Sequence, residues 1–314
     1  MPLPSPNAEA PALPSGDAAP NEVQEVPAMP QAKAESRLLT SEFQIVIEPT
    51  RGWQLVNVRE LWQYRELLGI LAWRDIKVRY KQTILGAAWA ILQPAMMMIV
   101  FTIFFGKLAK ISTGDVPYQL FVFCGLLPWT FFSTAMTNAA NSVVGSERLI
   151  TKIYFPRLIV PYAAVLASAV DFCIAFLLLL VLMLYYGVMP GLGMFLVPLI
   201  FLCLMFAALG IGTLLSAMNV AYRDIRYVIP FMVQIWFFAT PAIYMIVDRT
   251  GDSWMKTLIA VNPMNALIES FRAAVLGQTI PWAPLGLAIL MIATVFVAGS
   301  LYFRKVEDSF ADII

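Results

Sequence analysis

Long apolar windows alternate with short polar loops over most of this 314-residue chain. Each window is low in charge and holds about 20 residues or more. At a rise of 1.5 Å per residue, that length crosses a hydrocarbon core about 30 Å thick. The windows are residues 86–106, 118–144, 159–186, 191–218, 227–247 and 283–303. The pattern predicts an all-α, polytopic membrane protein, with a transmembrane domain over residues 83–303 that contains six membrane-spanning helices.

The residues ahead of the first window have a different composition. Eight of the 21 prolines fall in residues 1–30, mixed with Ala, Glu, Ser and Asn. Such a segment cannot bury enough apolar area to offset the entropy lost on ordering, so we predict a disordered tail over residues 1–40. Positions 41–47 alternate roughly between polar and apolar residues, and Pro49 follows them. This pattern favours a short strand or arm.

Residues 58–80 have the spacing of a surface helix. One face is apolar and another is polar. The apolar face has Leu61, Tyr64, Leu68 and Leu71, and the polar face has Arg59, Gln63 and Glu66. Tryptophan rings suit the headgroup level, and basic side chains precede the first window: Trp62, Trp73, Arg74, Lys77, Arg79 and Lys81. We predict an amphipathic helix on the cytoplasmic membrane surface, within an interface region of residues 41–82. The alternative is a solvated helix of a soluble domain, whose core the tail could not supply.

Composition supports the membrane assignment. Hydrophobic residues make up 60% of the chain and charged residues 13%, against about 45–50% and about 25% in globular proteins. The absence of histidine excludes His-based catalysis, His metal ligands and His pH sensing. Cys124, Cys173 and Cys203 lie in apolar windows without CxxC spacing, which favours small hydrophobes over disulfides or a metal site. A net charge of +1 gives no reason to expect a nucleic-acid partner.

The distribution of basic residues predicts the orientation. An even number of spans places both termini on one side of the membrane. Of the 21 lysines and arginines, 16 then fall on the side of the termini and five on the other. The positive-inside rule therefore predicts cytoplasmic termini, including the C-terminal residues 304–314.

The segment 252–282, between the fifth and sixth windows, is too short and too charged to span, yet too apolar for a plain loop. Glu269 and Arg272 are three residues apart, opposite an apolar face of Met264, Leu267, Ile268, Phe271 and Leu276. We predict a re-entrant or interfacial helix pair. Gly277 suits its C-cap, and Pro281 prevents its continuation.

Polar groups inside the windows are candidates for function. Asp171, near the middle of the third window, is the one charge deep in a predicted span. An intramembrane carboxylate costs about 2.5–3.5 kcal/mol on insertion scales, so it has either a functional role or a partner on a neighbouring helix. A polar cluster in the second window either lines a hydrated path or joins helices: Thr130, Ser133, Thr134, Thr137, Asn138 and Asn141.

Aromatic residues are concentrated in the first and fifth windows, where Pro94, Pro230 and Pro241 would kink the helices. Most such rings face lipid or lie in interface belts. Aromatic rings also stack on the C–H faces of sugars and let them slide past, which would suit a passage for a long carbohydrate. The residues at issue are Trp89, Phe101, Phe104, Phe231, Trp236, Phe238 and Tyr244.

Enzymatic motifs are missing from the sequence. It contains no GxxxxGK[ST] phosphate loop, no HExxH, no GxSxG and no pair of acids placed for glycosyl transfer. We expect no metal or cofactor on this chain, so a partner subunit would have to supply any energy from ATP and Mg²⁺.

Five separated segments of the sequence resemble a known family. They are RDIKVRYKQTILGAAWAILQP (74–94), SERLITKIYFPRLIVP (146–161), NVAYRDIRYVIPFMVQIWFFATPAIY (219–244), NPMNALIESFR (262–272) and FRKVEDSFADII (303–314). In order and predicted topology they are similar to the permease subunits of type-2 ABC exporters, above all those that export O-antigen, capsule or teichoic acid. The resemblance runs from about residue 55 to the end, and the Pro/Ala-rich tail departs from it.

The resemblance implies a bacterial inner-membrane complex of two permeases and two ATP-binding subunits. The surface helix and the loop from Glu147 to Arg157 would contact the ATPases, the loop through a short coupling helix. Enforcement of the positive-inside orientation is the alternative role for these charges. The implied coupling residues are Arg74, Lys77, Arg79, Glu147, Arg148, Lys152, Arg157, Arg223 and Asp224.

The resemblance also implies a polymer channel at the permease dimer interface. The first and fifth spans would form its walls, so their aromatics become candidate sugar contacts. The segment 252–282 would be an outer gate that includes Asn262, Pro263, Glu269 and Arg272.

We therefore expect the transmembrane subunit of an ATP-driven exporter of a lipid-linked polysaccharide. One alternative is a type-2 ABC permease for a small lipid or drug, which has the same fold and a narrower path. The other is a membrane-embedded glycosyl- or acyl-transferase, for which Asp171 is the one acid available inside a span.

Overall fold

The computed structural model of the chain describes residues 58–81, 86, 88–108, 116–222, 224–240, 261–307 and 310. These residues all belong to one compact unit, Gly52–Ile314. Every regular element within these ranges is a helix, which confirms the predicted all-α class. The predicted tail and arm, residues 1–57, lie outside the described residues.

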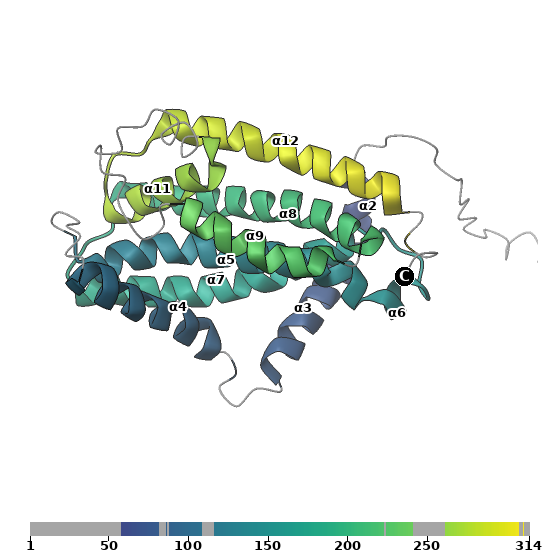
Figure 1. The fold of residues 1–314 in the computed structure, drawn as a ribbon, viewed down its shortest axis with the longest axis horizontal. Coiled ribbons are helices and arrows are strands. Elements are labelled where there is room, and N and C mark those ends of the chain that lie inside the picture. The colour runs from purple at the N-terminus through teal and green to yellow at the C-terminus, as the bar shows by residue number, and fades with distance from the viewer. Residues whose placement is uncertain are drawn as a thin grey trace, which may run out of the picture. The chain divides into compact units, whose positions relative to one another are not determined.

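Figure 1 shows the helices in chain order. Their bounds are α2 Val58–Gln63, α3 Arg65–Lys81, α4 Ala88–Phe101, the π-helix η1 Thr102–Leu108, α5 Tyr118–Gly145, α6 Glu147–Ile150, α7 Ile159–Tyr185, the 3₁₀-helix η2 Leu192–Leu196, α8 Val197–Ala221, α9 Ile225–Ala239, α11 Pro263–Leu276 and α12 Trp282–Val306.

Five stretches are long and apolar enough to cross a membrane: Ala88–Gly106, Tyr118–Gly145, Ile159–Tyr185, Leu192–Ala221 and Trp282–Val306. Each agrees with a predicted window to within one helical turn. The remaining window, 227–247, begins in α9, which has 15 residues and is therefore about 22 Å long. The rest of that window lies outside the described residues, so the six-span arrangement stays a prediction.

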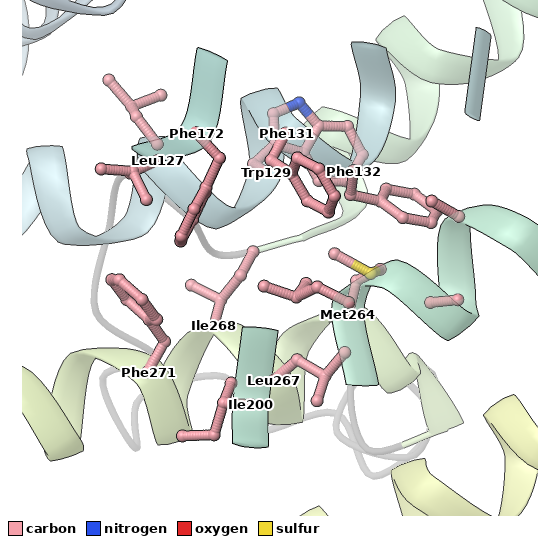
Figure 2. Close-up of a cluster of buried hydrophobic side chains, with 14 of the residues drawn as sticks. Leu127, Trp129, Phe131, Phe132, Phe172, Ile200, Met264, Leu267, Ile268 and Phe271 are labelled. Carbon is pink, nitrogen blue, oxygen red and sulfur yellow. The ribbon is translucent and has the colours of Figure 1, made fainter. Parts of the chain in front are cut away.

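Helix α5 forms the centre of the fold. It packs most extensively against α8 and α7, and it also contacts α4, α9 and α11. Most of its length is buried, including the large side chains of Phe121, Phe123 and Phe132. Figure 2 shows part of this core, where side chains of α5 and α7 face those of α8 and α11. There the Phe172 ring of α7 stacks on Phe201 of α8, with 4.2 Å between ring centroids.

Small residues let α8 approach both of its neighbours closely. A Cβ added to Gly299 of α12 would lie 2.3 Å from the Gly210 carbonyl oxygen of α8, so backbone meets backbone at this crossing. On its other side, a Cβ at Gly212 would lie 2.6 Å from the Ala139 Cβ of α5. Close backbone approach increases van der Waals contact, which drives helix association where lipid removes the hydrophobic driving force.

A second apolar cluster joins the ends of several helices. It combines Leu71 and Ala72 of α3 with Val143 of α5 and with Phe303 and Phe310 near the C-terminus. Phe303 and Phe310 meet edge to face, with 5.2 Å between ring centroids. This cluster docks α3 onto the bundle through the buried residues of one side. Ile70, Trp73 and Val78 of α3 are exposed among basic residues, a mixture suited to a headgroup layer. The helix predicted over residues 58–80 is divided into α2 and α3, and α3 is less amphipathic than predicted because its apolar and basic side chains are interspersed.

The α8–α12 crossing makes a prediction about stability. Gly299→Ala would force two backbones apart and lower the free energy of unfolding by about 1–3 kcal/mol, because overpacking strains a closely packed contact. Gly286→Ala on the same helix is the matched control, since no described heavy atom lies within 4 Å of the added Cβ. Thermal unfolding in detergent should show a lower Tm for Gly299→Ala only. Equal effects of the two substitutions would contradict the crossing.

Candidate functional site

Two helices expose unusually apolar surfaces. Helix α4 is largely uncovered, and Trp89 and Phe104 are 50% and 58% exposed along α4 and η1. Helix α9 exposes Phe231 and Phe238 to a similar degree. These four predicted channel aromatics therefore project away from the chain's own core. Tyr244, the seventh candidate, lies outside the described residues.

The other two predicted channel aromatics pack within the chain. Phe101 at the end of α4 packs against Phe237 of α9, with 5.9 Å between ring centroids, so the two exposed helices touch there. Trp236 points toward α5 and meets Phe132 edge to face at 5.2 Å and Trp129 at 6.3 Å. The sequence could not distinguish the exposed rings from the packed ones. Whether a ring is exposed depends on which neighbouring helix packs against its own helix.

Asn262 joins α9 to α11. Its side-chain oxygen accepts hydrogen bonds from the Trp236 indole N–H and the Met264 backbone N–H, both at 3.1 Å. Its amide nitrogen donates to the Thr240 hydroxyl at 2.8 Å. Asn262 is thus the N-cap of α11, with Pro263 in the first helical turn. We call Asn262, Trp236, Thr240 and Met264 the Asn262 junction.

Helix α11 is almost enclosed by α5, α8, α12 and η2. Gly277 ends it with a φ of 70°, which confirms the predicted left-handed C-cap. The sequence pattern placed Arg272 on a polar face opposite the apolar side chains, but the side chain is not exposed there. It is buried on α11, and its guanidinium carbon lies 3.8 Å from the ring centroid of Phe121 on α5. A cation over an aromatic face is attracted by the ring quadrupole, so Arg272 anchors α11 to α5. Glu269 is half-buried one turn away.

The predicted coupling helix is shorter than expected. Helix α6 comprises only Glu147–Ile150, so the prediction of one helix carrying all four charges is wrong for Lys152 and Arg157, which lie in turns after it. Glu147, Arg148 and Lys152 are exposed, whereas Arg157 is half-buried. Asp224 is exposed just before α9, and Arg223 lies outside the described residues.

The basic residues of α3 differ in their partners. Arg74 pairs with the adjacent Asp75 at 2.9 Å, and the Lys77 amine lies over the Trp73 ring at 5.4 Å. Arg79 turns inward and pairs with Asp171 of α7, which also accepts a hydrogen bond from the Tyr80 hydroxyl. The sequence pattern did not predict that Arg79 and Asp171 pair. A carboxylate in a span is stabilised by a partner, and the basic cluster before the first window supplies a cation for Asp171.

Most polar groups of the predicted α5 cluster have hydrogen-bond partners within the protein. The hydroxyls of Thr130, Ser133 and Thr137 donate to carbonyls of their own helix, as does the Asn141 amide. Asn138 donates to Ser168 of α7 at 3.0 Å. From α8, Asn219 donates to the Ala140 carbonyl at 3.0 Å and to the Asn141 side-chain oxygen at 3.1 Å. The bonds made by Asn138 and Asn219 join helices, which favours interhelical joining for Asn138 and Asn141, whereas the hydroxyl bonds stay within α5. Across the described ranges, no three His, Cys, Asp or Glu side chains gather as a metal site would require.

The sequence pattern, the helical bundle and the charged end loops agree with a comparison against protein families. The model of the ABC-2 type transporter family matches residues 66–276, which extend from α3 through α11. The chain belongs to the ABC-2 type transporter family.

Three relatives of this ABC-2 transporter chain cover between 74% and 82% of its length. It is 33% identical over 258 residues to the O-antigen export system permease protein RfbA of Myxococcus xanthus, covering 82% of this chain and 98% of the relative. A protein of the same name from Klebsiella pneumoniae is 26% identical, with 79% and 95% covered. The polysialic acid transport protein KpsM of Escherichia coli is 22% identical, with 74% and 91% covered.

The Asp171 pair predicts a coupled effect on stability. Asp171→Asn or Arg79→Gln should each lower the free energy of unfolding by about 1–3 kcal/mol, because each leaves a half-buried charge unpaired. This loss lies between the losses measured for exposed ion pairs and for fully buried ones. The double variant Arg79→Gln/Asp171→Asn should lose less than the sum of the single losses. Unfolding in detergent measures all three variants, and strictly additive losses would rule out the pairing.

The Asn262 junction predicts a graded series. Asn262→Ala removes the cap and two interhelical bonds, so we expect it to lower the free energy of unfolding by about 1–2 kcal/mol. Trp236→Phe removes one N–H donor while keeping an aromatic ring, so its effect should be smaller. Thermal unfolding compares the two. A larger loss in Trp236→Phe than in Asn262→Ala would contradict the central place of Asn262.

Proposed function

We propose that this chain is the permease subunit of an ATP-driven exporter that moves a lipid-linked polysaccharide, such as O-antigen, capsule or teichoic acid, across the bacterial inner membrane. The observation that carries the proposal is the end-to-end match to relatives named as O-antigen export permeases, up to 98% of their length. The relatives named for polysialic acid transport support the same class of substrate.

The orientation in this proposal follows the basic residues. Exposed basic side chains lie toward the α6 end of the bundle: Arg74 and Lys77 of α3, Arg148 of α6, Lys152 just after α6, and Lys305 at the end of α12. At the other end of the bundle, the basic residue of α11, Arg272, is buried. The positive-inside rule supports a cytoplasmic location for the α6 end and both termini.

The assembly in this proposal contains two copies of the chain and two ATP-binding subunits. The exposed aromatics of α4, η1 and α9 support a second copy facing them, with the polymer passing between the two. We restrict the channel-wall candidates to the four outward-facing rings, Trp89, Phe104, Phe231 and Phe238. The candidates for the ATPase contact are the exposed charges of α6 and Asp224, which is exposed just before α9.

The mechanism in this proposal has three steps. ATP binding brings the partner subunits together and displaces α6 and α3. Because α3 is tied to α7 by the Arg79–Asp171 pair, the displacement is passed to the bundle. The path between the two copies then opens, and the glycan is extruded outward past α11 in steps. The Asn262 junction connects the wall helix α9 to α11, which would let the wall and the outer gate move together.

Two other functions are less well supported. A membrane-embedded transferase would need a carboxylate for acid–base chemistry, and Asp171 is engaged with Arg79 and Tyr80. A permease for a small lipid or drug would share the fold. The relatives named for O-antigen export and polysialic acid transport favour the polysaccharide over such a substrate.

Purification and export assays test the proposal. The chain should co-purify from gently solubilised membranes with an ATP-binding subunit whose hydrolysis rises when lipid-linked glycan is added. Deletion of its gene should abolish surface polysaccharide. A chain that purifies alone, with normal surface polysaccharide after deletion, would overturn the proposal.

Matched variants separate the channel wall from the lipid-facing surface. Phe231→Ala on α9 should slow export several-fold, whereas Leu290→Ala on α12 should not, although both side chains are 65% exposed. Equal export by the two variants would remove α9 from the channel wall.

A further inference from the structure

A cavity of about 340 Å³ with a mixed apolar and polar lining lies among α3, α4, α5 and α7, and none of the roles above assigns it a ligand. This volume falls within the range of about 300–1,000 Å³ typical of small-molecule sites. Its lining on α4 includes Trp89, one of the proposed channel-wall rings, so the cavity lies beside the proposed path between two copies.

Two polar side chains of the cavity are available to a ligand. The Thr134 hydroxyl and the Gln93 amide line it, and within the described part of the chain neither has a hydrogen-bond partner. Other polar groups that line the cavity already have hydrogen-bond partners: Thr130 donates to the Leu127 carbonyl, and Asn138 donates to Ser168. Thr134 and Gln93 come from different helices, α5 and α4, so together they can contact a ligand from two sides.

The charges at the cavity decide what kind of ligand fits. Arg79 and Asp171 both line it, and they pair with each other. The cation repels metal ions and ammonium groups, and the carboxylate repels phosphates, so neither class gains from the site as a whole. A neutral ligand rich in hydroxyl groups suffers neither repulsion. It can donate to the carboxylate and accept from the guanidinium without separating them.

Aromatic rings complete the lining. Trp89 of α4, Phe131 of α5 and Phe172 of α7 border the cavity. Flat apolar rings beside hydroxyl, amide and ionic groups match the two kinds of surface on a sugar ring, its C–H face and its hydroxyl rim. A lipid tail would leave the polar groups unsatisfied, at a cost of roughly 1–3 kcal/mol each.

A neighbouring cavity lies toward the end of the bundle that carries α6. This second cavity has a volume of about 420 Å³, shares Arg79 and Asn138 with the first and reaches Gly145 and Ser146, just before α6. Its other charges, Arg74 and Asp75, are also paired. The two cavities therefore adjoin at Arg79 and Asn138, and the charges that line both of them are paired.

We infer that this cavity is a saccharide-binding site within each permease copy, where one or two sugar units of the glycan bind before they pass into the path between copies. The inference rests on the proposed function and adds a location and residues for substrate recognition. Thr134 and Gln93 supply direct hydrogen bonds, and the Arg79–Asp171 pair supplies a charge-balanced wall.

Cysteine protection tests the site directly in the complex with the ATP-binding subunit. In a chain whose Cys124, Cys173 and Cys203 are replaced by Ala, Thr134→Cys should react with a cationic methanethiosulfonate reagent. Delipidated glycan from the same organism, which lacks lipid and phosphate, should slow this reaction at least five-fold. Ser133→Cys is the matched control, since it is the adjacent position and does not line the cavity. Its labelling should not respond to glycan.

Isosteric variants provide a second readout. Thr134→Val removes the hydroxyl and should raise the glycan concentration for half-maximal ATPase stimulation by roughly 2- to 10-fold, the effect of one hydrogen bond. Thr134→Ser keeps the hydroxyl and should behave as wild type, as should Ser133→Ala.

The outcomes separate the two proposals. If the wild-type complex exports no glycan, the proposed function fails, and this site fails with it. If export is normal but delipidated glycan protects neither position, or both equally, the saccharide site alone is overturned. Protection by the lipid-linked form only would assign the cavity to the lipid carrier and would also overturn it.

Discussion

A carboxylate in an otherwise apolar span is stable only beside a partner, and this requirement connects the surface helix to the membrane bundle. Asp171 accepts from both Arg79 and Tyr80 at the end of α3. The middle of α3, at Leu71 and Ala72, is docked in the second apolar cluster. Helix α3 is thus held at two places by two different interactions, one apolar and one ionic. A helix held in this way is suited to passing a displacement to α7, as the proposed mechanism requires.

The bundle combines a closely packed half with an uncovered half. Around α5, α8, α11 and α12, glycines bring backbones into contact, and Arg272 fixes α11 over Phe121. Helices α4 and α9 instead expose their apolar side chains and touch through Phe101 and Phe237. Protein interiors packed at crystal-like density resist deformation, so the helices with the fewest packed neighbours move at the lowest cost in free energy. The uncovered helices are therefore the ones suited to a path whose width changes.

The proposed transport path and the saccharide cavity use different chemistry. Outward-facing rings on α4 and α9 offer broad, weak contacts that allow a polymer to slide. The cavity beside Asp171 offers a few directed hydrogen bonds within one chain, which suits recognition of a sugar unit. Separation of recognition from passage would let a long polymer be selected at its first units without retarding the rest.

The sequence by itself determined the class of the fold and the positions of most of its helices, because a hydrocarbon solvent requires long apolar runs and helical hydrogen bonding wherever the chain crosses. It also located α11 and its Gly277 cap, since left-handed backbone favours glycine. The tertiary structure alone decided the partners. Neither the pairing of Arg79 with Asp171, 92 residues apart, nor the burial of Arg272 follows from helical periodicity. Periodicity shows which side chains share a face, whereas the helix that covers that face is chosen by packing between segments far apart in the chain. For the same reason the sequence grouped Trp236 with the channel aromatics, and only the arrangement of α5, α9 and α11 directed it to Asn262.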